Sequence, residues 1–588
     1  MRSDRTCLLH RVPSACRQEV MDMGVIGPKI RVDHRVESYE GINALSAIVM
    51  AFSESVGLRS LIDAECSYDR ERRILSPGMG IKCMMGPIMW LGCKLPLVRV
   101  ERNYIGVPCD LIFGEGIESG NLNDDALGRC LDTVAETDMR QLVNKSSELC
   151  RRRFGFESQV YHDDGTNIPF YGMSKDDVEE EGFKPAFACS PKDHRRDLLH
   201  YCLQMTVDEN GILVASKGHR GDITDIEADR DTIAFLGEIL EKSERERIVY
   251  VADSKMATKE TLGKLRGLGI RFVTRCPTEF GFHLQERALD AAMAASCSRS
   301  DRYPDLEIYD EMLIIGKPGR TADTHPIRTL VCFSDTRFRK KLYEMESERL
   351  KTEQRIRDRV DGRHWGSTQE ISDFLSSFAL PTNCRIVETI GSFTIPGKAD
   401  YRGRRRKDEV VPDIERYRIE RIEVVADTAA AEIDARRASA TVLITDIPCT
   451  ESDQAVYRTG MTADGIVQLY REEHKVEHCI RFTKSGCRID QVFLQTPSRE
   501  NAMMFMVSEL AVLTTTADAV FRREGMTLNG SRMTMNALMH ELVGSTIRLD
   551  RGEMRMFIEH PLGKEIDLFA IPDALKINPR LLLGYMDC

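Results

Sequence analysis

The sequence predicts a multidomain α/β protein in which a helical N-terminal domain precedes a mixed α/β core, and an insertion divides that core in two. Three observations support this. A chain of 588 residues is too long for one hydrophobic core. Apolar residues recur at helical spacing through residues 41–153, and strand-like segments begin at Ser158. The stretch after residue 280 is far longer than a simple connection needs.

The region 37–153 is expected to be helical, and residues 1–36 to be an N-terminal extension. Apolar side chains follow helical spacing in residues 42–64, 80–97 and 125–153. Such a domain is compatible with nucleic-acid binding and equally with a packed bundle that has no ligand of its own. Its sequence does not decide between the two.

Strand and helix signals alternate in residues 154–280, the first part of the core. The expected strands are 159–171, 199–207, 211–216, 248–252 and 270–275. One helix begins at a capping box of Thr224 and Glu227, and another ends at Gly269. The order β-β-β-α-β-α-β is that of a ribonuclease-H-like fold. In that topology the first and fourth strands are neighbours.

An insertion is expected at residues 281–455, followed by the second part of the core at 456–525 and a C-terminal region at 526–588. Residues 329–334 and 383–395 look extended, and residues 336–362 form a highly charged helix with a solvated face. Trp365 lies in the insertion, where burial in a local core is favoured over contact with a flipped base. Residues 526–588 suggest no function.

Composition sets broad limits. Apolar residues make up 42% of the chain and charged residues 30%, as in ordinary soluble proteins. The net charge of −11 argues mildly against nucleic-acid binding, but basic clusters occur at residues 151–153, 195–196 and 402–407. The 18 cysteines form no Cys-x-x-Cys pair, which favours a reducing cytoplasm over a zinc ribbon or a secreted fold. No membrane span or signal peptide is expected.

Three acidic residues stand out as candidate metal ligands. Asp164 lies on the first core strand, Asp253 follows the fourth, and Glu477 lies in a helical segment 224 positions further on. Hard divalent cations prefer oxygen ligands, and two such ions about 3.5–4 Å apart can assist phosphoryl transfer. Because side chains alternate along a strand, only one of Asp163 and Asp164 can face the site. His162 shares the face of Asp164, either as a supporting group or as a packed ring.

The segment that contains Glu477 also shows a regular spacing of residues. Tyr470, Glu477 and Lys484 are separated by seven positions, which on a helix returns nearly to the same face. This resembles the Tyr-x2-Arg-x3-Glu-x6-Lys signature of DDE insertion-sequence transposases, the IS-four-like group, with Glu473 standing in the place of the signature's Arg. Segments 161–172, 192–198, 221–225, 251–256 and 270–277 resemble the same branch, which has a helical N-terminal domain and a largely β insertion.

The resemblance implies a function. Asp164, Asp253 and Glu477 would be the catalytic metal ligands for two Mg²⁺ ions, for which Mn²⁺ can substitute. Lys484 and Tyr470 would contact DNA, and Glu473 would have no metal role. The partners would be double-stranded transposon ends and target DNA, bound by a homodimer or higher oligomer in the prokaryotic cytoplasm. Asp164 is selected over Asp163 by this family pattern.

Two alternatives remain. The chain could be a transposase-derived DNA-binding protein without catalytic activity, although all three carboxylates are present. Residues 163–166 also resemble the Asp-x-Asp-Gly-Thr box of haloacid-dehalogenase-like phosphatases. In that box the first Asp is the nucleophile, whereas His162 occupies its place here, so the attacking group would be missing.

Overall fold

The computed structural model describes residues 42–107, 109–171, 183–188, 194–316, 325–397, 411–450, 460–489, 494, 496–542, 544–550, 555–559 and 570–577. The chain divides into two compact units. The first comprises residues up to 274 together with 454–461 and 466–588, and the second comprises 275–453 and 462–465. The expected N-terminal extension at 1–36 and the basic cluster at 402–407 lie outside the described residues.

The N-terminal part of the first unit is helical, as the apolar spacing predicts. Its main helices are α2 (Ala44–Ser55), α3 (Leu58–Glu65), α4 (Pro77–Leu91), α5 (Cys109–Phe113), α6 (Asp124–Ala135) and α7 (Met139–Phe154). Side-chain caps start several of them: Asn43 accepts from the Leu45 and Ser46 amides, and Ser76 accepts from the Met79 amide. A short strand, β1 (Ile42–Asn43), pairs with β15 (Thr546–Asp550), which in turn pairs with β16 (Arg555–Glu559).

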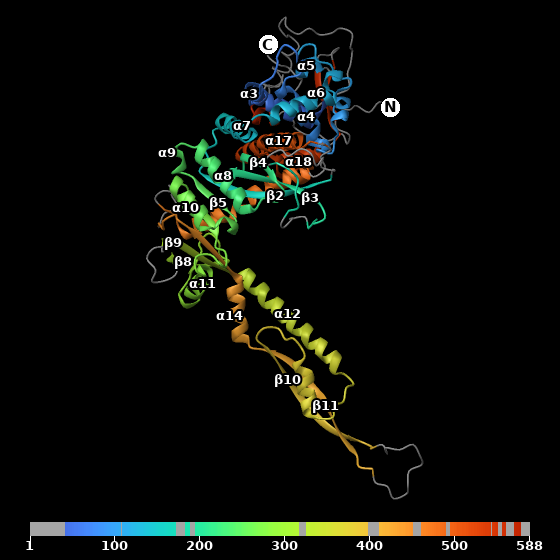
Figure 1. Cartoon of the computed structure of the whole chain (residues 1–588), viewed down its shortest axis with the longest axis vertical. Helices are drawn as coiled ribbons and strands as arrows, with labels where there is room; N and C mark the ends of the chain where they lie inside the picture. The colour runs from blue at the N-terminus through green and yellow to red at the C-terminus, as the bar shows by residue number, and fades with distance from the viewer. Residues whose placement is uncertain are drawn as a thin grey trace, which may run out of the picture. The chain divides into compact units, whose positions relative to one another are not determined.

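These helices share one hydrophobic core with the long helix α17 (Pro497–Arg523) and with apolar side chains of the neighbouring sheet. Helix α17 packs against α4, α6 and α7 (Figure 1). It is long and apolar enough to cross a membrane, yet 89% of its apolar window is buried inside the protein. Its apolar character therefore has a structural explanation as the central helix of a core.

Five strands form the main sheet of the first unit, in the order β4-β3-β2-β5-β6. They are β2 (Val160–Phe170), β3 (Leu199–Asp208), β4 (Leu213–Arg220), β5 (Val249–Ala252) and β6 (Arg271–Arg275). The first three are antiparallel, whereas β5 is parallel to both β2 and β6. Helices α8 (Asp225–Ile239) and α10 (Lys259–Leu268) follow β4 and β5, so the expected order β-β-β-α-β-α-β is confirmed.

Local sequence signals account for the boundaries of these elements. Gly211 adopts a φ of 77° in the tight turn between β3 and β4, a conformation that favours glycine. Thr224 and Glu227 form the predicted capping box at the start of α8. Gly269 closes α10 in the left-handed region with a φ of 79°, so the chain turns directly into β6.

The second unit contains helices as well as strands, so the expectation of a largely β insertion was too narrow. Its strands β12 (Ala440–Thr445), β9 (His325–Ser334), β8 (Leu306–Ile315) and β7 (Ser298–Arg299) are adjacent in that order and antiparallel. Its helices are α11 (Leu284–Ala294), α12 (Asp335–Val360), α13 (Thr368–Ser376) and α14 (Thr428–Ser439). Short amphipathic helices such as α13 and α14 give weak sequence signals, because most of their stability comes from packing.

A long hairpin of β10 (Cys384–Ile395) and β11 (Ile414–Ala426) lies alongside α12 (Figure 1). Between them is a small apolar core that includes Ile356, Ile371 and Val424. Trp365 belongs to this core and is only 8% exposed. The expectation that Trp365 packs locally is therefore confirmed.

A buried carboxyl in the first unit predicts how stability changes with pH. Glu509 on α17 is fully buried; Ser146 of α7 donates to one of its oxygens at 2.6 Å, and the other has no hydrogen-bond partner in the described structure. Burial raises the pKa of Glu509 from 4.5 to about 8, although the Ser146 hydrogen bond acts in the opposite direction. The folded state therefore holds a proton that the unfolded state releases, and stability falls as the pH rises from about 4.5 to about 8.

Glu509→Gln, which keeps the shape without the charge, is expected to stabilise the first unit at pH 8.5 by about 2–4 kcal/mol, since one pKa unit corresponds to about 1.4 kcal/mol. It should have little effect at pH 4.5. Urea unfolding followed by Trp90 fluorescence in a Trp365→Phe background measures this in the first unit. An equal effect at both pH values would contradict the titration of Glu509.

Candidate active site

Asp164 and Asp253 occupy neighbouring positions on two parallel strands, Asp164 within β2 and Asp253 directly after β5. The last parallel pair of β2 and β5 is Asp163 with Ala252, and the next residue of each segment is one of the two aspartates. Asp164 is half-buried and accepts from the Gly165 amide at 2.8 Å. Asp253 is exposed and accepts from the Ser254 amide at 2.6 Å. The expectation that the two positions are neighbours in the sheet is confirmed.

The preceding residue, Asp163, points away from this site into the protein. It is 1% exposed, and its carboxylate accepts from Gln204 at 2.5 Å, Thr206 at 2.5 Å and Tyr250 at 2.7 Å. Buried Asp229 on α8 lies beside it, and burial followed by the charge of Asp163 holds the pKa of Asp229 well above its usual range. Strand alternation therefore separates a structural carboxyl, Asp163, from an accessible one, Asp164.

His162 is a packed ring. It is fully buried, and neither ring nitrogen has a hydrogen-bond partner within the described residues. Burial, followed by the nearby charge of Lys475, lowers the pKa of His162 to about 3. The ring is therefore neutral at physiological pH. It cannot replace the aspartate nucleophile that a haloacid-dehalogenase-like mechanism needs, because no substrate reaches a fully buried ring.

The segment that carries the spacing signal is not one continuous helix. Tyr470 lies in α15 (Ala463–Arg471), Glu477 in α16 (His474–Arg481) and Lys484 in a π-helical turn, η7 (Phe482–Gly486). Between α15 and α16 the backbone hydrogen bonding changes from a four-residue to a three-residue spacing. The Glu473 amide donates to the Tyr470 carbonyl at 3.2 Å. Lys475 anchors the start of α16 through Glu472 at 2.8 Å and the backbone carbonyl of Glu209, which follows β3.

Glu473 faces the two strand aspartates. It is half-buried at the junction of α15 and α16. Burial, then the charges of Asp253, Asp164 and Glu477 in that order, raises the pKa of Glu473 to about 7, against the effect of a hydrogen bond from Tyr470. The seven-residue spacing did not predict this direction of Glu473, because the chain breaks between α15 and α16.

Glu477 is exposed on α16, and its charge acts on Glu473 and on His478. Helix α16 packs against β2 and β3. Within the described residues, no group of three His, Cys, Asp or Glu side chains converges closely enough to hold a metal ion. The donor types suit a hard divalent cation, since all are carboxylate oxygens. Two of them, Asp164 and Asp253, are already adjacent.

One cation in this neighbourhood was missed by sequence reasoning. Lys255 follows Asp253 by two residues and pairs with Asp225 at the start of α8. The hydrogen bond to Asp225 is the main cause that raises the pKa of Lys255, and the charges of Asp253 and Asp164 add to it. The ammonium group therefore offsets part of the negative charge around the aspartates. A lysine after a strand-ending aspartate is too common for its spacing to predict this.

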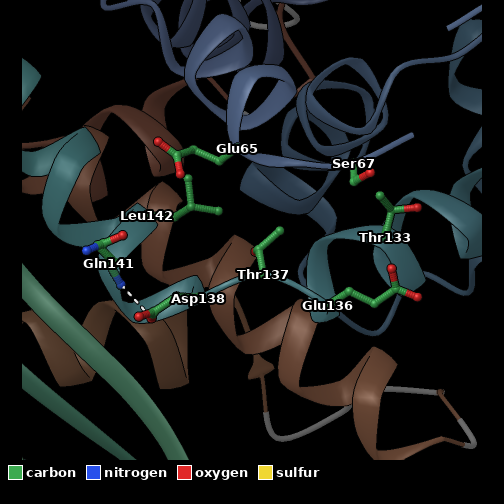
Figure 2. Close-up of a pocket in the computed structure, with 8 residues that line it drawn as sticks. All are labelled: Glu65, Ser67, Thr133, Glu136, Thr137, Asp138, Gln141 and Leu142. Carbon is green, nitrogen blue, oxygen red and sulfur yellow. Dashed lines mark hydrogen bonds between the residues drawn. The ribbon is translucent and has the colours of Figure 1, made fainter. Parts of the chain in front are cut away.

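Two pockets formed by described residues lie away from these aspartates. A cavity of about 180 Å³ in the helical part is lined by Glu65, Ser67, Thr133, Glu136, Thr137, Asp138, Gln141 and Leu142 (Figure 2). Three of these are acidic, which disfavours phosphate binding. Another cavity, in the second unit, is lined by charged residues of both signs, among them Arg299, Arg302 and Asp464. Asp464 is already engaged by the Ser300 hydroxyl at 2.5 Å.

Comparison with known proteins gives limited matches. Residues 39–147 match a family described as a domain of unknown function, DUF4277. No curated protein matches. Among solved structures, the chain is similar to the piggyBac transposase in a synaptic complex with hairpin DNA, with a TM-score of 0.34 and 9% identity over 87% of this chain and 80% of that one. A likeness of this size does not establish a shared fold.

Proposed function

We propose that this chain is a DDE-type transposase that cleaves DNA at the ends of an insertion sequence and joins them to a target. The observation that carries the proposal is that Asp164, within β2, and Asp253, directly after β5, occupy neighbouring positions of two parallel strands. The strand order around them, β4-β3-β2-β5-β6, is the one expected of a ribonuclease-H-like core. Helix α16, which carries Glu477, packs against β2 and β3 of the same sheet.

In the proposed site, Asp164, Asp253 and Glu477 would hold two Mg²⁺ ions, or Mn²⁺ in their place. Such cations would supply activation of the attacking oxygen and stabilisation of the leaving one. The protein residues supply oxygen ligands and position the DNA. No side chain acts as a nucleophile, since water and then a DNA 3′-hydroxyl attack the phosphodiester bonds. Lys484 and Tyr470 contact the DNA backbone near the cleaved end.

The partners follow from the reaction. Both ends of the element must be held together, so the active form is at least a homodimer on double-stranded DNA. We place this reaction in the prokaryotic cytoplasm, on the nucleoid. The runner-up is a DNA-binding protein derived from such an enzyme and devoid of cleavage activity, because among the described residues no three His, Cys, Asp or Glu side chains converge closely enough to hold a metal ion.

A cleavage and strand-transfer assay tests the proposal. The substrate is DNA that carries the inverted repeats flanking the gene, and the purified chain is incubated with Mg²⁺ or Mn²⁺. Cleavage at the repeat ends followed by joining to target DNA supports the transposase. Specific end binding without cleavage in either metal supports the inactive DNA-binding protein. If the chain neither binds nor cleaves these ends, both the transposase and the inactive DNA-binding protein are contradicted.

Lys484→Ala is expected to weaken binding to transposon ends and to lower the slope of log affinity against log salt by about 1, because one phosphate contact releases about one counterion. Sequence preference should change little. The half-buried Lys484 lies in the π-helical turn that follows α16. Fluorescence anisotropy over a salt series, with Ca²⁺ in place of Mg²⁺ to block cleavage, measures the slope.

The matched control is Lys340→Ala, since Lys340 on α12 is 75% exposed and pairs only with Glu344 one turn away among the salt bridges of the described chain. This variant should keep the wild-type slope. If Lys484→Ala behaves like the control, Lys484 is an ordinary surface lysine and the Tyr-Glu-Lys spacing loses its functional meaning.

A further inference from the structure

We infer that the surface at which α7 and α17 end binds the phosphate backbone of double-stranded DNA, in addition to the contacts near the proposed metal ligands. This helix-end surface carries five exposed cations, Arg152, Arg153, Arg522, Arg523 and Lys576. It includes part of the basic cluster at residues 151–153, which has no role in the proposed site. The inference rests on the proposed function, because it assigns a second contact to the same DNA partner.

Helices α7 and α17 lie side by side in the first unit (Figure 1). Ser146 of α7 donates to Glu509 of α17 at 2.6 Å. About two turns further along α7, the carbonyl of its last residue, Phe154, accepts from the Arg523 guanidinium at 2.6 Å. The two helices therefore point in the same direction and end together. Their last carbonyls carry a partial negative charge, which attracts cations to this surface.

The chain that follows α19 (Ala570–Ala574) adds a further cation to the helix-end surface. The Arg153 guanidinium donates to the Lys576 carbonyl at 2.6 Å, and the Lys576 ammonium donates to the Arg153 carbonyl at 3.1 Å. The same ammonium lies 5.3 Å from the centre of the Phe154 ring, and the Arg523 guanidinium lies 4.6 Å from the centre of the Phe156 ring. These contacts fix the positions of the cations without neutralising their charges.

The helix-end surface also reaches the turn that anchors α16. Arg522 donates to the carbonyl of Asn210, between β3 and β4, at 2.6 Å. Lys475 of α16 donates to the carbonyl of the preceding residue, Glu209. The end of α17 and the start of α16 are therefore attached to neighbouring carbonyls of one turn. Because Glu477 follows Lys475 by only two residues, DNA at the proposed site lies close to this surface.

Most of the positive charge on the helix-end surface has no carboxylate partner. Two of the five cations form ion pairs, each with a glutamate of its own segment. Within the described residues, no carboxylate forms an ion pair with Arg153, Arg522 or Lys576, and each of these donates to a backbone carbonyl instead. A bond to a carbonyl leaves the charge in place, and a guanidinium has five N–H groups, so donors remain for a ligand. This local excess contrasts with the net charge of −11 for the chain.

The phosphate backbone of DNA is the ligand that suits such a surface. A duplex carries one negative charge per about 1.7 Å of its axis, so separate cations can each meet a phosphate. Guanidinium groups bind phosphate oxygens through two parallel hydrogen bonds. Contacts to phosphates position a protein on the duplex but do not read its bases. The helix-end surface is therefore expected to bind DNA of any sequence.

The test measures DNA binding by the full chain, with Ca²⁺ in place of Mg²⁺ to block cleavage. The double variant Arg153→Gln, Arg522→Gln is compared with the double variant Lys242→Gln, Arg247→Gln. The control removes the same charge from two exposed positions in and just after α9 (Lys242–Arg245) of the same unit. Fluorescence anisotropy over a salt series is recorded with a transposon-end duplex and with an unrelated duplex of equal length.

The double variant Arg153→Gln, Arg522→Gln should bind both duplexes about tenfold or more weakly at about 0.1 M salt. The slope of log affinity against log salt should fall by about 2, because each lost phosphate contact retains about one counterion on the DNA. The preference for transposon ends over the unrelated duplex should change little. The control variant should keep the wild-type slope and affinity.

A second measurement uses the wild type and so does not depend on the folding of a variant. Lysine side chains are acylated with an amine-reactive reagent, and the extent at each position is read by mass spectrometry. Bound DNA should slow the acylation of Lys576 and leave that of the exposed Lys242 unchanged. If thermal unfolding shows that the double variant does not fold, this measurement decides, and equal acylation of Lys576 with and without DNA would overturn the inference.

The outcomes distinguish this inference from the proposed function. If Arg153→Gln, Arg522→Gln binds like the wild type while the wild type cleaves transposon ends, the helix-end surface is overturned and the transposase stands. Equal loss in the control variant would mean that only the net charge matters, which also overturns the inference. Weaker binding by the double variant of a chain that cleaves in neither metal supports the surface and contradicts the transposase. A wild type that binds neither duplex contradicts both.

Discussion

Asp253→Asn is expected to abolish cleavage of transposon ends in Mg²⁺, by more than about a hundredfold, which corresponds to roughly 2.7 kcal/mol of barrier. The amide keeps the size of the side chain but removes a charged oxygen ligand beside Asp164. Binding of the DNA ends should stay at the wild-type level or rise, since a negative charge near the phosphates is lost. Single-turnover cleavage and fluorescence anisotropy measure the two effects separately.

The matched control is Asp222→Asn. Asp222 follows β4, and its carboxylate pairs with the Arg220 guanidinium at 2.6 Å, so its charge already has a partner on the surface. This variant should cleave at the wild-type rate. Cleavage by Asp253→Asn within a hundredfold of the wild type would show that the assignment of the site is wrong, whatever the behaviour of Glu473 and Glu477.

Arg328→Ala is expected to destabilise the second unit by about 3–5 kcal/mol, because removing one partner of a buried ion pair leaves the other charge without compensation. Arg328 on β9 is 2% exposed, and its guanidinium donates to both oxygens of Asp310 on β8, at 2.9 and 2.6 Å. It also donates to the carbonyls of Ile447, at 3.3 Å, and Pro448, at 3.0 Å. The substitution therefore removes bonds to β8 and to the chain after β12 at once.

Trp365 reports this unfolding when Trp90 is replaced by Phe, because the chain has only 2 tryptophans and Trp365 belongs to the second unit. Urea unfolding of Arg328→Ala is compared with that of Arg421→Ala. The Arg421 side chain is 72% exposed and pairs with Glu423. The exposed pair should contribute less than about 1 kcal/mol. Similar midpoints for the two variants would show that the buried pair is not needed for folding.

The order of elements in the core and the positions of two acids could be predicted from local sequence. Alternation of apolar and polar residues, capping residues and left-handed glycines are local signals. The strands around Asp164 and Asp253 and the caps at Thr224 and Gly269 could therefore be predicted from sequence. That the first and fourth strands are neighbours then followed from the ribonuclease-H-like order of elements, whereas their register is seen only in the structure. The helices of the second unit were harder to predict from sequence, because α13 and α14 are short and depend on packing against the hairpin and α12.

The structure of the segment from Tyr470 to Lys484 could be predicted only in part. A step of seven positions linked Tyr470, Glu477 and Lys484, but the chain between them changes from α15 to α16 and then to a π-helical turn. The break is stabilised by the contact of Lys475 with Glu209, which lies 266 positions earlier. No periodicity within the segment contains this contact, so the direction of Glu473 was not predicted.

The roles of the neighbouring acids show the same division. Alternation along β2 predicted that Asp163 and Asp164 face opposite sides, and this much needs no tertiary information. The burial of Asp163 depends on tertiary contacts, because its donors Gln204, Thr206 and Tyr250 lie on other strands 41 to 87 positions away. The pattern of side-chain directions is set by the local backbone. The burial and charge that give each carboxyl its chemistry are set by segments that only folding brings together.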